Sequence, residues 1–248
     1  EYLIKIADKK PLEVCDLILK SAKTENPWVH CDFIDAAIKM PSKIATKLLP
    51  KIKSEGWFNQ YFMSRPADKG GELMVKFIKD GEIDKACDLA SLLLDVKKIE
   101  KDDSVFTGKK NSKTFEVKSC IDDWQYGQLL EKDYPILVEV APIQAVSLLV
   151  KILEKAIRHV TGKADYEDSF IINYKRPSIE ENEHNWAKED VENLLITAIR
   201  DSIDAIAKKS PGQLKEAVVS LGHAEGIYPI LLRIQLDAYR KYSTVFEN

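Results

Sequence analysis

The fold is decided by the stretch EIDKACDLASLLLDV at residues 82–96 of this 248-residue chain. Its apolar residues recur three and four positions apart, at Ile83, Ala86, Cys87, Ala90, Leu93 and Leu94. Because an α-helix turns once every 3.6 residues, this spacing places them on one face of a helix. The stretch therefore predicts an amphipathic helix with one buried face.

The same spacing recurs along most of the chain, and prolines interrupt it at the expected boundaries. Pro41 ends one segment, and Pro50 is expected to kink another because proline lacks the N–H that a helix interior needs. Glycine and proline number only 10 each, which favours helices over turn-rich folds. We expect an all-α fold of about ten helices, at residues 11–23, 28–40, 42–54, 66–79, 82–96, 122–140, 142–160, 189–209, 213–221 and 227–242.

Two segments of the chain resemble each other. Ala7-Asp8-Lys9 recurs as Ala67-Asp68-Lys69, and in the following helix Cys31-Asp32 recurs as Cys87-Asp88. The match indicates either a repeated helix pair or only the amphipathic pattern that both segments share. A repeated pair that cannot bury its apolar faces alone is the building unit of a solenoid. The prediction is a single domain over residues 1–248, a right-handed α-α superhelix of the HEAT/armadillo-like solenoid type.

Composition restricts the function classes. Lys and Arg number 37 against 40 Asp and Glu, so the net charge of -3 does not favour general electrostatic binding to nucleic acid or to anionic membranes. The four cysteines are too sparse for a disulfide framework, which favours reduced thiols and a cytoplasmic location. No apolar run reaches the ~20 residues that span a bilayer. Because the chain opens without Met inside patterned sequence, we expect a piece of a larger protein.

Motifs that would indicate chemistry are incomplete. Gly108-Lys109-Lys110 lacks the upstream glycine and the following hydroxyl of a phosphate-binding loop. A calcium loop starting at Asp103 would need a glutamate at its twelfth position, which is Thr114. The histidines are not at zinc-ligand spacing. The sequence therefore predicts no catalytic residue, no cofactor and no metal.

Two insertions exceed the ~12 to 15 residues that structureless loops in compact domains reach. They cover residues 97–121 and 161–188, and the first contains apolar segments on both sides of Gly108–Asn111, which predicts a hairpin with a basic tip. If the helices alternate in direction, both insertions leave from the same end and form one surface. The expected partner-binding residues are Phe106, Lys109, Lys110, Lys113, Phe115, Phe170, Tyr174, Arg176 and Trp186. The alternative is that the basic first loop and the acidic second loop pair with each other.

A resemblance to a known protein class rests on a few positions of the chain. The stretch from Tyr2–Ala7 through Trp28 and Lys51-Ile52-Lys53 to Gly81-Glu82-Ile83 resembles the HEAT-like α-helical repeat region of large bacterial multidomain proteins, and so does Tyr228–Ile234. Similar regions occur beside nucleotide-binding modules of signal-transducing ATPases linked with phage defence. The resemblance implies a scaffold or sensor role and places any ATPase site outside this chain.

The leading expectation is a non-enzymatic helical-repeat module that presents a surface to a protein partner or to other domains of its parent chain, with no membrane partner. The alternative is nucleic-acid binding through the basic insertion 97–118. A helical-repeat glycosylase would use Trp124 beside Asp122 and Asp123, but helix capping explains these aspartates more simply. The tryptophans are either core anchors or interface residues, and their burial decides which.

Overall fold

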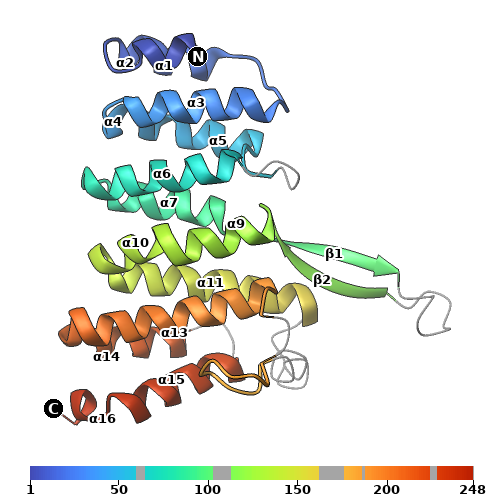
Figure 1. Ribbon diagram of the computed structural model, residues 1–248, viewed down its shortest axis with the longest axis vertical. Coiled ribbons are helices and arrows are strands. Elements are labelled where there is room, and N and C mark those ends of the chain that lie inside the picture. Colours follow the sequence, from blue (N-terminus) through green and yellow to red (C-terminus); the bar gives the residue numbers. More distant parts are fainter. Residues whose placement is uncertain (60–64, 103–112, 162–175, 186–187, 224–227, 248) are drawn as a thin grey trace. The chain divides into compact units, whose positions relative to one another are not determined.

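The computed structural model describes residues 1–59, 65–102, 113–161, 176–185, 188–223 and 228–247 (Figure 1). This part of the chain is mostly helical and holds one two-stranded sheet, which agrees with the predicted all-α class. None of the described helices is long and apolar enough to cross a membrane. The contacts divide the chain into two compact units, where the sequence favoured one domain. The first unit is Glu1–Asp95 with Cys120–Val140, and the second is Val96–Ser119 with Ala141–Asn248.

The helices of the first unit follow the predicted order closely. They are α1 (Tyr2–Ile6), α2 (Pro11–Lys20), α3 (Pro27–Lys39), α4 (Ser42–Ala45), α5 (Leu49–Glu55), α6 (Arg65–Lys79), α7 (Ile83–Leu93), α9 (Asp123–Gln128) and α10 (Tyr134–Val140). Two irregular turns join them, the 3-10 turn η1 (Thr46–Leu48) and the π turn η2 (Leu129–Asp133). The sequence missed α1, because five residues are too few to show a helical period.

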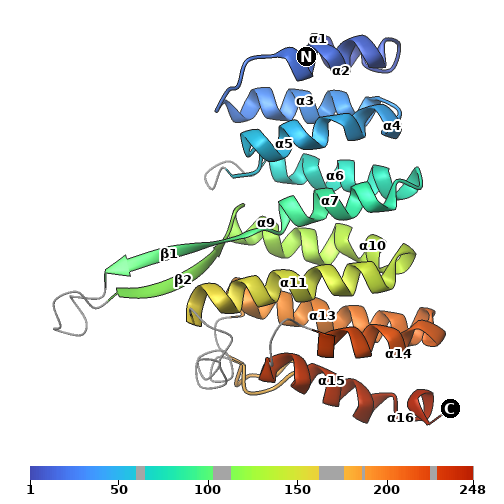
Figure 2. The same cartoon turned by 180° about the vertical axis from the view of Figure 1, so that it is seen from behind.

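The helices of the first unit pack in two rows. In one row α1 contacts α3, α3 contacts α6 and α6 contacts α10, and in the other row α2 contacts α4 and α5 contacts α7 (Figures 1 and 2). The repeat seen in the sequence pairs α2 with α6 and α3 with α7, which lie in opposite rows. The matched helices are not equivalent in the fold, which favours the shared amphipathic pattern as the explanation.

The predicted kink at Pro50 is confirmed. Pro50 cannot donate a helical hydrogen bond to the Thr46 carbonyl four residues earlier. The chain tightens into η1 instead, where the Leu49 N–H donates to that carbonyl. The predicted helix 42–54 is therefore divided into α4, η1 and α5.

A buried aromatic cluster closes the core beside α5. Gly56 adopts the left-handed conformation (φ 64°) that favours glycine, and it turns the chain so that Trp57 enters the core with 0% exposure. The Trp57 indole stacks on the buried His30 imidazole at 5.2 Å between ring centroids and lies 5.6 Å from Phe33. Its Nε1–H donates to Glu55 at 2.9 Å, so the indole is satisfied in the core.

The same cluster contains an ion pair and a histidine. Lys51 Nζ lies 2.6 Å from Glu55 and donates to the Ser21 carbonyl at 2.9 Å, which ties the end of α2 to α5. His30 Nε2 lies 3.0 Å from the Thr24 carbonyl. Because a carbonyl only accepts, Nε2 carries the proton and the neutral ring leaves Nδ1 as an acceptor.

We expect acidification to destabilise the first unit through His30. Burial lowers the pKa of His30 below its ordinary value, and the charged groups that face it are Glu55 and Lys51. In the unfolded chain the imidazole takes up a proton near its ordinary pKa of about 6.5, while the folded state resists protonation. Stability is therefore intact above that pH and falls as the pH drops through the window below it.

The measurement is urea unfolding at about pH 7.5 and about pH 5, for the wild type and for His30→Gln. Glutamine can donate to the Thr24 carbonyl but does not titrate. The wild type should lose more stability on acidification than the variant. Equal losses in both proteins would show that His30 does not carry the pH dependence.

The second unit combines a hairpin with helices. It contains β1 (Val96–Asp102), β2 (Lys113–Ser119), α11 (Pro142–Thr161), α13 (Val191–Lys209), α14 (Pro211–Ser220), the 3-10 turn η3 (Leu221–His223), α15 (Pro229–Lys241) and α16 (Ser243–Phe246). α11 packs on α13, α14 contacts both, and α15 contacts α13 and α14. The predicted helices over 142–160, 189–209, 213–221 and 227–242 are confirmed with small shifts of their ends.

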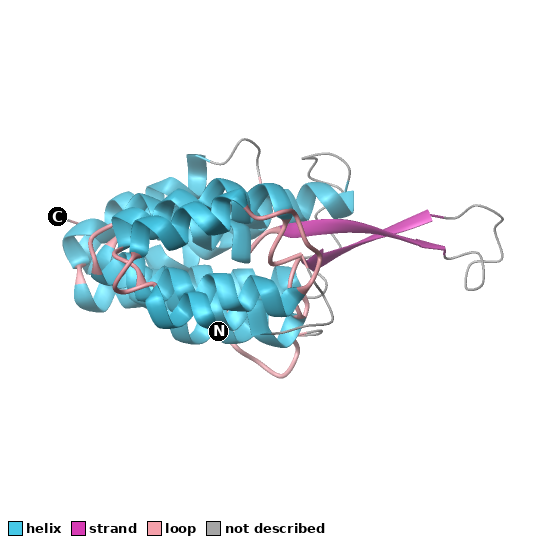
Figure 3. Cartoon of the chain, turned by 90° about the horizontal axis from the view of Figure 1, so that it is seen from above, coloured by secondary structure: helices cyan, strands magenta, loops and turns pink. Residues whose placement is uncertain are grey.

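The predicted hairpin is confirmed in the first insertion. β1 and β2 pair antiparallel from Val96 opposite Ser119 to Asp102 opposite Lys113 (magenta in Figure 3). The buried residues Val96, Val117 and Ser119 share one face of this ribbon, and both strands contact α11. The described strands reach further towards the helices than the predicted arms, since β1 begins at Val96 and β2 ends at Ser119. The expected first arm, 104–106, lies outside the described residues.

Candidate protein-interaction surface

Most of the predicted partner-binding residues lie outside the described part of the chain. This applies to Phe106, Lys109, Lys110, Phe170, Tyr174 and Trp186. Lys113 and Phe115 lie on β2, and only the backbone of these two residues is described. Arg176 is the one predicted residue whose side chain is described, and it defines the local structure.

The described parts of the two insertions lie at the same end of the second unit. Figures 1 and 2 show the base of the hairpin and the segment 176–185 at the end where α11 finishes and α13 begins. The hairpin contacts α11 through both strands and α13 through β2. The predicted pairing of the basic tip with the acidic loop involves Lys109 and Lys110, which lie outside the described ranges. Of the acidic loop, the described Glu180 pairs with Arg240, and Glu181 pairs with Arg176 and Arg200.

Arg176, which was predicted to bind a partner, is buried within the second unit. Its side chain is 1% exposed, and Nη1 donates to Thr197 Oγ1 at 2.9 Å and to the Asn193 carbonyl at 3.4 Å. Nη2 donates to the Ile179 carbonyl at 3.2 Å and to Glu181 at 2.7 Å. These bonds hold the segment 176–185 against α13, so the guanidinium has a structural role and is not accessible to a partner.

Glu181 is the carboxylate that lies between Arg176 and Arg200. Its Oε1 accepts from Arg176 and, at 3.0 Å, from Arg200 Nη1 on α13. Burial by itself raises the pKa of Glu181, but the hydrogen bonds and positive charges of Arg176 and Arg200 outweigh burial and leave the pKa lowered. The carboxylate is therefore ionised at neutral pH and accepts a charge-assisted hydrogen bond from each of the two guanidinium groups.

A groove forms where the held segment meets α15. Arg233 donates to the carbonyls of Arg176 at 3.0 Å and Pro177 at 2.6 Å, which joins α15 to the segment. Beside these bonds lies an open cavity of about 420 Å³. We call it the α15 groove, and it is lined by Pro177, Ser178, Ile179, Glu180, Arg233, Leu236, Asp237 and Arg240.

The α15 groove combines an apolar strip with charged edges. Leu236 lines the groove and is 66% exposed. The apolar strip continues along α15 outside the groove lining, with the exposed Leu232 one turn before it and Tyr239 one turn after it. The Tyr239 ring packs edge-on against Phe246 at 4.5 Å between ring centroids. Arg240 bridges Glu180 at 2.6 Å and Asp237 at 2.9 Å. An exposed apolar strip with a charged border is typical of a surface that a partner helix covers.

The sequence contained a signal for this strip. The helix PILLRIQLDAYRK at Pro229–Lys241 buries Ile230, Leu231, Ile234 and Ala238, while further apolar residues fall on a second face. A helix that is apolar on two faces needs two partners. The helix predicted at 227–242 is confirmed, and the apolar residues on its second face are the sequence signal for this strip.

No cysteine thiol lies in the α15 groove, because the four cysteines all belong to the first unit. No group of three or more His, Cys, Asp or Glu in the described residues is arranged to hold a metal ion. Cys15, Cys31, Cys87 and Cys120 form no disulfide. Burial raises the pKa of Cys15, Cys31 and Cys87, so these three groups are protonated at neutral pH.

Comparisons with protein-family models, with curated proteins and with solved structures return no match for this chain.

Proposed function

We propose that the protein is a non-enzymatic, cytoplasmic helical-repeat scaffold or sensor module of the HEAT-like α-α superhelix type. The two-row packing of helices in the first unit supports a repeat architecture. Its partner is a protein, or other domains of a bacterial parent chain. The contact surface is the end of the second unit that holds the hairpin and the α15 groove.

The observation that carries this proposal is the exposed apolar strip on α15. Two leucines and a tyrosine lie along one helix face, although the opposite face of α15 is already buried. Covering the strip removes apolar area from water, which stabilises a complex by about 25 cal/mol for each Å² buried. Charged edges at Arg240 and Glu180 then select which partner fits.

The test is affinity capture from nuclease-treated lysate, with point variants instead of deletions. Replacing the whole insertion 161–188 would remove the buried Arg176 and the Glu181 that pairs with it, and would disturb the fold. Leu236→Glu changes the strip, and Leu17→Glu on α2 is the matched control because that leucine is also exposed, at 56%.

The wild type and the Leu17→Glu control should retain the same protein, and Leu236→Glu should lose it. Retention of that protein by all three chains would contradict the assignment of the α15 strip as the contact surface.

Nucleic-acid binding through the hairpin is the second candidate function. The strand register sets Lys97 directly opposite Lys118, which concentrates positive charge on one face of a two-stranded ribbon. A ribbon of this kind fits the major groove of duplex DNA. If it binds there, affinity for a labelled duplex should fall steeply with salt, and replacing both lysines with glutamine should reduce the slope of log K against log salt by about 2. Binding that is insensitive to salt, or absent, would reject this candidate.

A further inference from the structure

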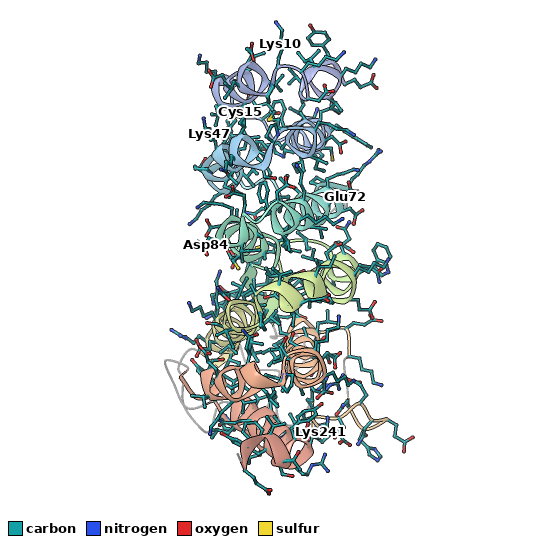
Figure 4. All side chains as sticks on the ribbon, turned by 90° about the vertical axis from the view of Figure 1, so that its left-hand side faces the viewer. Lys10, Cys15, Lys47, Glu72, Asp84 and Lys241 are labelled. Atoms are coloured by element: carbon teal, nitrogen blue, oxygen red, sulfur yellow. The ribbon has the colours of Figure 1, made fainter. Side chains whose placement is uncertain are left out.

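A second groove lies in the first unit, on the row that contains α5 and α7. It has a volume of about 380 Å³, and we call it the α5–α7 groove. Its lining residues are Thr46, Lys47, Leu49, Pro50, Lys53, Lys85, Asp88, Ser91 and Leu92. Figure 4 shows Lys47 and Asp84 on this side of the first unit and Glu72 of α6 on the opposite side.

The groove follows from the kink in the chain before α5. Because Pro50 interrupts the helical hydrogen bonds, η1 bends the chain between α4 and α5. Thr46 and Lys47 before the bend and Pro50 and Lys53 after it then border the same hollow. The kink predicted at Pro50 therefore divides the helix and also forms one wall of this groove.

The floor of the α5–α7 groove is apolar. Leu49 is buried and Leu92 half-buried, while the Pro50 ring is exposed at the bend. Apolar side chains from two helices thus form a seat large enough for a hydrophobic side chain from another molecule.

The border of the groove carries positive charge that the chain itself does not neutralise. Lys47 and Lys53 are exposed, and neither forms an ion pair within the described residues. Lys85 is paired with Asp88 at 2.9 Å, so that edge is balanced. Two lysine charges remain for a ligand.

We propose that the α5–α7 groove binds an acidic peptide segment of a partner protein. An apolar side chain of the peptide packs on Leu49, Pro50 and Leu92, and flanking carboxylates pair with Lys47 and Lys53. A nucleic-acid backbone fits less well, because the apolar floor formed by Leu49, Pro50 and Leu92 offers it no partner. This surface belongs to the other unit from the α15 groove, so it does not depend on the function proposed above.

The experiment measures fluorescence anisotropy of a short labelled peptide that carries glutamates around two leucines set one helical turn apart. A second peptide replaces every glutamate with glutamine, and a labelled single-stranded DNA of similar length is the third probe. The proteins are the full chain, the double variant Lys47→Glu with Lys53→Glu, and the control Lys23→Glu with Lys215→Glu. All four lysines are exposed, and both double variants change the net charge equally.

The acidic peptide should bind the wild type and the control, while Kd should rise about tenfold or more for the groove variant because two attractive contacts become repulsive. The glutamine peptide should bind more weakly than the acidic one. The proposal is overturned if the acidic peptide fails to bind the wild type, if both double variants weaken binding equally, or if the DNA binds the same lysines more tightly than the peptide.

Discussion

Replacing Arg176 with alanine is expected to lower the free energy of unfolding of the second unit by about 3 kcal/mol. The substitution removes the donor for the carbonyls of Ile179 and Asn193 and for the Thr197 hydroxyl. Glu181 keeps its bond to Arg200, so the carboxylate is not left alone and the loss stays below that of a stranded buried charge. Amide hydrogen exchange in α13 and α15 measures the effect within the unit.

Arg240→Ala is the matched control for this prediction. Arg240 also bridges two carboxylates, Glu180 and Asp237, but its side chain is exposed to water, which screens both ion pairs. The amide hydrogens of α13 and α15 should exchange at the same rates in Arg240→Ala as in the wild type. If the two arginine variants lost the same protection, burial of Arg176 would not explain its importance.

Replacing Trp57 with alanine should destabilise the first unit by about 3–5 kcal/mol, the usual cost of emptying a buried aromatic site. The cavity would expose one face of His30 and the edge of Phe33, and Glu55 would lose one of its two donors. Urea unfolding followed by circular dichroism measures the change.

Trp124→Ala is the control. The Trp124 side chain is 68% exposed, so the substitution removes the same volume as Trp57→Ala without leaving a cavity. Its stability should stay within about 0.5 kcal/mol of the wild type. A large loss in Trp124→Ala, or a small one in Trp57→Ala, would show that the core of this unit is not centred on the aromatic cluster.

The helices could be predicted because their signal is local. The helical spacing of apolar residues over 83–94 predicts α7. Pro41 predicts a helix end and Pro50 a kink, because a proline ring has no N–H to donate within a helix. The hairpin was predictable in the same way, since turn residues lie between two short apolar segments.

Burial of single side chains could not be predicted, because it depends on helices that are far apart in the sequence. Four tryptophans look alike as residues, yet Trp57 is buried while Trp28 and Trp124 are exposed. Arg176 was expected at a surface, but Thr197 and Glu181 surround its guanidinium. The two grooves likewise form from pairs of segments whose proximity no pattern shows, such as Lys53 beside Lys85.

The most direct test of the scaffold proposal is hydrogen–deuterium exchange of the full chain, free and bound to the protein that it captures from lysate. The scaffold proposal predicts new protection in α15 around Leu236 and in the segment 177–180. Protection that leaves α15 unchanged and falls elsewhere on the chain would contradict it.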